Sequence, residues 1–337
     1  MKNITKVGLS ALAGALAMTS ANAGSMSLSG SIEATYTTGG GYSSIGQPLG
    51  MDKELTVKGS TELDNGTAVN YKQTITDAMG YNDAEIAFVT GFGTIALTSA
   101  GAPISAIDDV TPTAFEEANA LLGTTIDDVN GADGDTGIRY TLADVAGSGM
   151  TFDAFYTHKH GTGDAHADNA TSGAIATGNK AAWEFVVKGN VPGVDGLGVG
   201  IGYAVLEKFD PNTASAVAAG SNNQDEGTAY VTYAFGPLKA GIQVGAVSVG
   251  STGVHEKHVY NGISYAVSDN LSLSYNFIDS AKTTGVGQRT EQNMDSLSAS
   301  YSMGGMTISI ADQDCSNCGY TVNRSIDATS ISMAIAF

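Results

Sequence analysis

From residue 25 onward, hydrophobic and polar residues alternate along most of the chain. In the first such segment one face carries Met26, Leu28, Ile32, Ala34 and Tyr36, and the other carries Ser27, Ser29, Ser31, Glu33 and Thr35. Side chains alternate between the two faces of a β-strand, so a period of two predicts strands rather than helices. After the second segment comes Asn65-Gly66, a pair that tolerates the positive φ angles of tight hairpin turns.

We count sixteen alternating segments, and therefore predict sixteen strands. They begin near Met26, Asp52, Thr67, Tyr81, Thr94, Gly137, Met150, Lys180, Leu197, Gly227, Lys239, His258, Leu271, Met294, Met306 and Ile326. Short turn candidates alternate with longer polar stretches, which we expect to be loops at residues 39–50, 100–137, 158–179, 210–226, 251–256, 283–293 and 312–324. Short turns at one end and long loops at the other are typical of an outer-membrane barrel.

The width of such a barrel decides which face is outside. Sixteen strands enclose a channel that side chains cannot fill, so the apolar face must meet lipid and the polar face must meet water. Aromatic residues on the apolar face are candidates for the two interfacial girdles, namely Tyr36, Tyr140, Tyr156, Trp183, Phe185, Tyr203, Tyr265, Phe277, Tyr301 and Phe337. The pattern predicts an all-β fold, a 16-stranded antiparallel transmembrane β-barrel.

The first 23 residues have a different character. Lys2 and Lys6 form a short basic stretch, residues 7–18 are apolar and small, and Ala21-Asn22-Ala23 fits the small-residue rule for cleavage. We therefore expect residues 1–23 to be a signal peptide and residues 24–337 to form a single barrel domain. The rest of the chain holds no apolar run near the 18 residues that a spanning helix needs.

Composition narrows the function classes. With 15 Lys and Arg against 34 Asp and Glu, the net charge is −19, which argues against a nucleic-acid partner. Neither G-x-S-x-G nor H-E-x-x-H occurs, so we expect no enzyme and no catalytic residue. Cys315 and Cys318 are the two cysteines, and in an exported chain we expect a local disulfide between them. Structural zinc would need a second pair.

The last segment ends at Phe337, with Ile331, Met333 and Ile335 on the same face. A final strand that ends in Phe resembles the assembly signal of bacterial outer-membrane proteins. Together with "MSLSGSIEATY", "STELDNGTAVNYK" and "GFGTIALTSAG", the whole chain resembles the general porins of Gram-negative bacteria, and in particular the alphaproteobacterial-type porins. This resemblance implies a homotrimer in the bacterial outer membrane, in contact with lipid and lipopolysaccharide, that passes small hydrophilic solutes.

The resemblance also implies that residues 100–136 form a third loop that folds inward and constricts the barrel. This stretch contains no Lys or Arg, and its acids are Asp108, Asp109, Glu116, Glu117, Asp127, Asp128, Asp133 and Asp135. By alternation, the pore wall carries Lys58, Lys72, Arg139 and Lys188, and also Glu33, Glu54, Glu85 and Glu184. The family often has an arginine-rich wall, whereas this chain has only three arginines. We expect a net negative constriction and modest cation selectivity that salt weakens.

Several alternatives remain open at this point. Calcium is a candidate ligand of the loop acids because it would relieve their mutual repulsion, although no complete calcium motif and no other cofactor is predicted. His158, His160 and His166 with Asp164 and Asp168 form either a metal site or a solvated loop. The chain is a general diffusion channel, a substrate-specific channel that binds one solute class, or a secreted β-rich surface or adhesion protein that is soluble without detergent.

Overall fold

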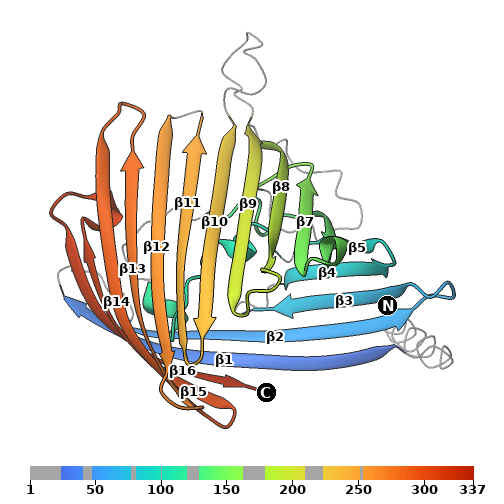
Figure 1. The fold of residues 1–337 in the computed structure, drawn as a ribbon, viewed down its shortest axis with the longest axis horizontal. Helices are drawn as coiled ribbons and strands as arrows, with labels where there is room; N and C mark the ends of the chain where they lie inside the picture. Colours follow the sequence, from blue (N-terminus) through green and yellow to red (C-terminus); the bar gives the residue numbers. More distant parts are fainter. Residues whose placement is uncertain are drawn as a thin grey trace, which may run out of the picture.

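The computed structural model describes residues 24–40, 48–76, 81–99, 101–119, 129–161, 179–208, 223–250 and 253–337, and Figure 1 shows the resulting barrel. The predicted signal peptide lies outside the described residues. Sixteen strands occur, namely β1 (Ser25–Gly40), β2 (Leu49–Glu62), β3 (Ala68–Ile75), β4 (Tyr81–Thr90), β5 (Gly93–Thr98), β6 (Gly137–Leu142), β7 (Met150–Thr157), β8 (Asn179–Asn190), β9 (Leu197–Lys208), β10 (Gln224–Phe235), β11 (Leu238–Val249), β12 (Val254–Ala266), β13 (Leu271–Thr283), β14 (Arg289–Met303), β15 (Met306–Ser316) and β16 (Ser325–Ala336). These described ranges also contain four short 3-10 helices, η1 (Ser105–Ile107), η2 (Glu116–Asn119), η3 (Val145–Gly147) and η4 (Cys318–Tyr320).

Every strand pairs with its neighbours in the chain, and β16 pairs with β1 to close the barrel. All pairs are antiparallel. At the seam, the terminal residue Phe337 exchanges two backbone hydrogen bonds with Gly30, at 2.8 and 2.9 Å. Closure removes the open sheet edges that lipid cannot satisfy. The predicted sixteen-stranded antiparallel barrel is confirmed.

The turn between β2 and β3 shows how the sequence sets the hairpins. Gly66 has φ +82° and its N–H donates to the Leu63 carbonyl at 2.8 Å. The Asn65 side chain accepts a hydrogen bond from the Thr67 N–H at 3.0 Å. Gly66 thus supplies the positive φ that the sequence predicts, and Asn65 adds a local acceptor.

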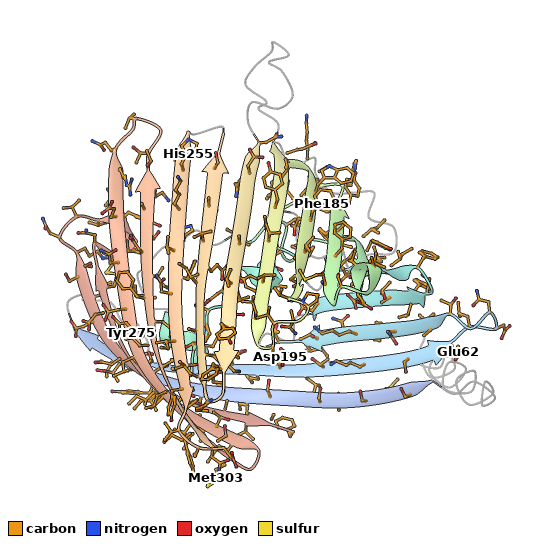
Figure 2. All side chains as sticks on the ribbon, viewed as in Figure 1. Glu62, Phe185, Asp195, His255, Tyr275 and Met303 are labelled. Atoms are coloured by element: carbon orange, nitrogen blue, oxygen red, sulfur yellow. A yellow bond between two sulfur atoms is a disulfide. The ribbon has the colours of Figure 1, made fainter. Side chains whose placement is uncertain are left out.

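The two faces of the wall differ in exposure and in chemistry (Figure 2). On β8, Trp183 and Phe185 are 44% and 46% exposed, whereas the intervening Glu184 is fully buried. Large apolar side chains such as Tyr275 on β13 and Ile331 on β16 continue the exposed face around the barrel. Seven of the predicted girdle aromatics are exposed on this face, namely Tyr36, Trp183, Phe185, Tyr203, Tyr265, Tyr301 and Phe337.

The predicted loop at residues 283–293 is mostly strand, and the predicted loop at residues 312–324 begins only after Ser316, so the bounds of both predictions are wrong. β13 continues to Thr283 and β14 begins at Arg289, and β15 continues to Ser316. These strand ends are polar on both faces because they extend beyond the apolar band, but backbone pairing does not depend on hydrophobic side chains. Within the described residues, none of the helices has the length and apolar character needed to cross a membrane.

Candidate functional site

A long segment joins β5 to β6 and carries η1 and η2; we call residues 101–119 and 129–136 the β5–β6 segment. Figure 1 shows its teal trace behind β9–β12, between those strands and β1–β3. Its backbone bonds to side chains of β8, β10, β11 and β13, namely Glu184, Glu226, Gln243, Ser274 and Asn276. The register places all five on the polar face of the wall. The segment therefore lies against this face.

Two buried carboxylates hold the segment at both of its ends. Glu184 accepts hydrogen bonds from the Ile104 N–H at 3.2 Å and from the Ala132 N–H at 2.6 Å. Glu226 accepts one from the Gly131 N–H at 2.7 Å. A buried backbone N–H without an acceptor is costly, so these contacts give the segment a defined position on the wall.

Apolar packing supports the same attachment. Ile104, Ile107 and Val129 of the segment are buried in one cluster with Phe155 and Val186 of the wall. Strict alternation assigns these wall positions to the polar face, and sequence reasoning missed that they are apolar. They are apolar because the segment, rather than water, covers them.

Glycines on the polar face bring the segment close to the wall. A Cβ at Gly202 would lie 2.9 Å from the Ile104 side chain, and a Cβ at Gly241 would lie 2.7 Å from Cδ of Pro112. At Gly262 it would lie 2.7 Å from the Pro112 carbonyl oxygen. Any larger residue at these three positions would push the segment off the strands.

The eight predicted wall residues all lie on the same face as Glu184 by strand register, namely Lys58, Lys72, Arg139, Lys188, Glu33, Glu54, Glu85 and Glu184. Lys58 stands directly opposite Lys72, which in turn stands opposite Glu85. Nζ of Lys72 is 3.7 Å from Asp83, so this lysine is partly neutralised. These residues form one group on β2–β4.

The remaining wall residues are not cross-strand partners of that group. Arg139 on β6 is 3.0 Å from Asp153 and is paired with it. Glu54 on β2 accepts a hydrogen bond from Thr56 at 2.7 Å. Lys188 and Glu184 lie on β8, across the barrel from β1 and β2 in strand order.

The acids of the segment differ in exposure. Asp109, Glu116 and Asp133 are exposed and Asp108 is half-buried, whereas Asp135 is buried. Asp135 accepts a hydrogen bond from the Gly161 N–H at 2.5 Å, and Asp133 accepts one from the Ser105 hydroxyl at 3.3 Å. Asp127, Asp128 and the side chain of Glu117 lie outside the described residues.

No three His, Cys, Asp or Glu side chains come together to hold a metal within the described ranges. Calcium at the loop acids therefore stays a prediction. Of the histidine group, His160 is buried with a ring nitrogen 2.9 Å from the Glu207 carbonyl oxygen, whereas His166, Asp164 and Asp168 lie outside the described residues.

Residues 8–312 match the sequence profile of the family described as Gram-negative porin. The chain belongs to this family. No curated protein sequence matches it. The fold resembles OmpT of Vibrio cholerae with a TM-score of 0.66 at 11% identity, over 93% of this chain and 98% of that one. It also resembles Salmonella typhi OmpF, with a TM-score of 0.65 at 12% identity, over 93% of this chain and 97% of that one. The anion-selective porin of Comamonas acidovorans gives a TM-score of 0.63 at 14% identity, over 93% of this chain and 100% of that one.

This membership confirms the predicted family, and with the barrel it places the porin in the bacterial outer membrane as a diffusion channel. The family and the fold are those of a channel and not of an enzyme. The secreted adhesion protein is therefore set aside.

The connection between β15 and β16 in this porin also packs onto the polar face. Cys315 is joined to Cys318 by a disulfide, and Cys318 is fully buried in a cluster with Ile278 and Met294. The Tyr320 hydroxyl lies 2.5 Å from that of Ser280 and donates to Glu256 at 3.3 Å. Lys282 is ion-paired with the same Glu256 and lies 5.3 Å from the centre of the Tyr320 ring. Alternation gave no signal for this second contact with the polar face.

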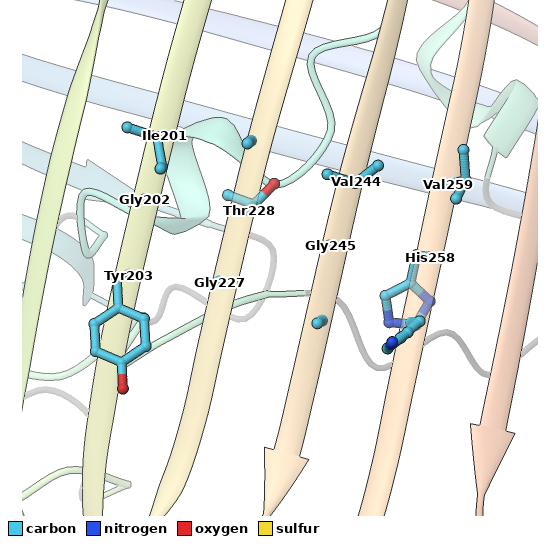
Figure 3. Close-up of a pocket in the computed structure, with 12 residues that line it drawn as sticks. Ile201, Gly202, Tyr203, Gly227, Thr228, Val244, Gly245, His258 and Val259 are labelled. Atoms are coloured by element: carbon cyan, nitrogen blue, oxygen red, sulfur yellow. The ribbon is translucent and has the colours of Figure 1, made fainter.

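On the outer wall of the porin, a shallow hollow of about 480 Å³ crosses β9–β12 (Figure 3). Its low floor comes from the small residues Gly227, Ala229 and Ala246, and its higher parts include Ile201 and Val244. Strand register puts all five on the face away from the β5–β6 segment. The lining of this hollow is therefore mainly apolar and lies on the outer face of the barrel.

Proposed function

We propose that this porin is a homotrimeric, modestly cation-selective diffusion channel for small hydrophilic solutes, and that the β5–β6 segment is its constriction. The observation that carries the proposal is the attachment of this segment to the polar face by Glu184. A segment fixed there occupies space that the closed barrel would otherwise leave to water.

The charge distribution supports cation selectivity. The segment presents exposed Asp109, Glu116 and Asp133, and the sequence from 100 to 136 contains no Lys or Arg. On the wall, Arg139 is paired with Asp153 and is largely neutralised. Low-dielectric walls concentrate the remaining negative field in the narrow part of the channel, which enriches cations there.

We infer the oligomeric state of the porin from its fold, and its lipid surroundings from its apolar outer face. One of the similar structures is described as the trimer form of Vibrio cholerae OmpT, with a TM-score of 0.64 at 12% identity. We infer a trimer for this chain as well, with lipid and lipopolysaccharide around the rest of its apolar face. The outer hollow on β9–β12 is part of that lipid-facing surface.

Reconstitution of the purified porin in a planar bilayer, with a potassium chloride gradient across it, tests the proposal. We expect ohmic steps that close in thirds, and a reversal potential of cation-selective sign that shrinks as salt rises. Anion-selective reversal would overturn the charge argument, and single-step closure would overturn the trimer. Absence of conductance from folded, heat-modifiable protein would overturn the diffusion channel itself.

A further inference from the structure

A hollow of about 420 Å³ lies between the β5–β6 segment and the polar face of β8–β12. The segment contributes Val110, Pro112 and Thr113 to its lining, and the wall contributes polar and small residues. These wall residues are Asn190, Gly196, Gly198, Thr232, Tyr233, Ala234, Lys239 and Ser264. The volume falls in the range of small-molecule sites.

The hollow exists because the sequence leaves space on the wall. A Cβ at Gly198 would lie 2.7 Å from the Thr232 hydroxyl, so a side chain there would fill part of it. On the other side, the Asn276 side chain donates to the Pro112 carbonyl at 3.1 Å and the Val110 N–H donates to Gln243 at 2.9 Å. Both sides of the hollow are therefore held by defined contacts.

Its chemistry is unlike that of the rest of this acidic channel. Lys239 is the charged residue among the lining residues, and no carboxylate lines the hollow. In the part of the chain that the structure describes, no ion pair involves Lys239, in contrast to Lys72, Arg139 and Lys282. Its ammonium group is accordingly available to an anion from the solution.

The remaining lining groups restrict what that anion is. Asn190 supplies an amide, and Thr232 and Ser264 supply hydroxyls, which match hydroxyl groups of a solute. Val110 and Pro112 of the segment offer an apolar side that suits a C–H surface. One ammonium, several neutral hydrogen-bonding groups and one apolar side together fit a small monoanion that carries hydroxyls.

We propose that this hollow is a binding subsite for small hydroxylated carboxylates such as sugar acids, with the carboxylate on Lys239. The proposal rests on the diffusion channel proposed above and adds a preferred solute class to it. A weak subsite of this kind holds an anion for part of its passage through a channel whose constriction disfavours anions. It therefore produces saturable block of the cation current.

The test is the current through bilayer channels, at constant ionic strength, as sodium gluconate replaces sodium chloride. We expect a saturable block by gluconate and none by sorbitol, which has the same hydroxylated chain without the carboxylate. Lys239→Gln should raise the half-blocking concentration about tenfold, because a charge-assisted hydrogen bond is lost. Lys239→Arg keeps the charge and should retain the block.

Lys58→Gln is the matched control, because it removes the same charge from the wall on β2, outside the hollow. Its effect on the half-blocking concentration should stay within about twofold, since screening weakens distant charges. The subsite would be overturned if Lys58→Gln and Lys239→Gln changed the half-blocking concentration equally, or if the block never saturated. In either case the open-channel current steps would still support the diffusion channel. Heat-modifiable migration in gel electrophoresis shows that each variant folds.

Discussion

The Glu184 carboxylate accepts a hydrogen bond from the backbone N–H of Ala132 at 2.6 Å, across 52 positions of the chain. It also accepts one from the Ile104 N–H, so one side chain of β8 holds both ends of the β5–β6 segment. Glu184→Ala should loosen the segment by about 2 to 4 kcal/mol, because two buried donors lose their acceptor. We expect a larger and noisier single-channel conductance and a lower unfolding temperature in detergent.

Glu85→Ala is the control for that experiment. Glu85 lies on the same face, on β4, and makes no hydrogen bond to the segment in the described part of the chain. It should change ion selectivity without raising current noise. An unchanged conductance in Glu184→Ala would show that the segment keeps its place without this carboxylate.

Gly131 and Gly134 provide a second test of the same attachment. Both have positive φ, +60° and +73°, so alanine costs roughly 1 kcal/mol of backbone strain at either position. At Gly131 a Cβ would also lie 2.2 Å from Oε1 of Glu184, whereas at Gly134 it would meet nothing within 4 Å. Gly131→Ala should therefore reproduce the noisy, enlarged conductance of Glu184→Ala, and Gly134→Ala should conduct like the parent.

Conductance in the double variant Glu184→Ala/Gly131→Ala then checks that both changes act on one contact. We expect it to differ little from either single variant, because contacts that share a partner are not additive. If the decreases in unfolding temperature of the two single variants instead added up fully in the double variant, Glu184→Ala and Gly131→Ala would act on different contacts.

The barrel was predictable from the sequence because its wall follows a simple period. Residues such as Trp183, Glu184 and Phe185 alternate between the exposed apolar face and the polar face. The same alternation put the charged wall residues on one face. Which charges form ion pairs was not predictable from this alternation. Arg139 on β6 pairs with Asp153 on β7, although its direct cross-strand partner is Phe155.

What alternation could not show is the wall beneath the β5–β6 segment. Phe155 and Val186 are apolar on a face that the period marks as polar, because a distant part of the chain covers them. One local signal was present. Gly198, Gly200 and Gly202 recur at every second residue of β9, on the face where the segment and Tyr230 approach closely. A run of glycines on one face of a strand marks a close neighbour.

The disulfide between Cys315 and Cys318 is expected to act locally. Cys315→Ala/Cys318→Ala removes it without burying a new hydroxyl, since both positions are buried. A ring this short contributes about 2 kcal/mol through chain entropy, so the unfolding temperature should fall only modestly. We expect greater current noise as Tyr320 loses its fixed place beside Lys282.

Reductant added to the parent protein should give the same noise as the double alanine variant. Tyr320→Phe, which keeps the disulfide but loses the hydrogen bonds to Ser280 and Glu256, should give part of it. Quiet channels in all three cases would show that the β15–β16 connection does not affect conduction.

Three aspartates stand in one row on neighbouring strands. Asp295 on β14 is directly opposite Asp314 on β15, which is directly opposite Asp327 on β16. Like charges in direct opposition destabilise a sheet by roughly 0.2 to 1 kcal/mol per pair. Asp314→Asn removes the middle charge and both repulsions, so the unfolding temperature should rise, and the gain should shrink as salt screens the charges.

Asp312→Asn is the matched control on the same strand and the same face. Its direct cross-strand partners are Leu297 and Thr329, and it accepts a hydrogen bond from the Thr329 hydroxyl at 3.1 Å. Loss of this acceptor should leave the unfolding temperature unchanged or slightly lower at every salt concentration. If Asp314→Asn also failed to raise the unfolding temperature at low salt, the three aspartates would not repel one another appreciably in the folded porin. Their direct pairing across the strands would then not lower the stability of the barrel.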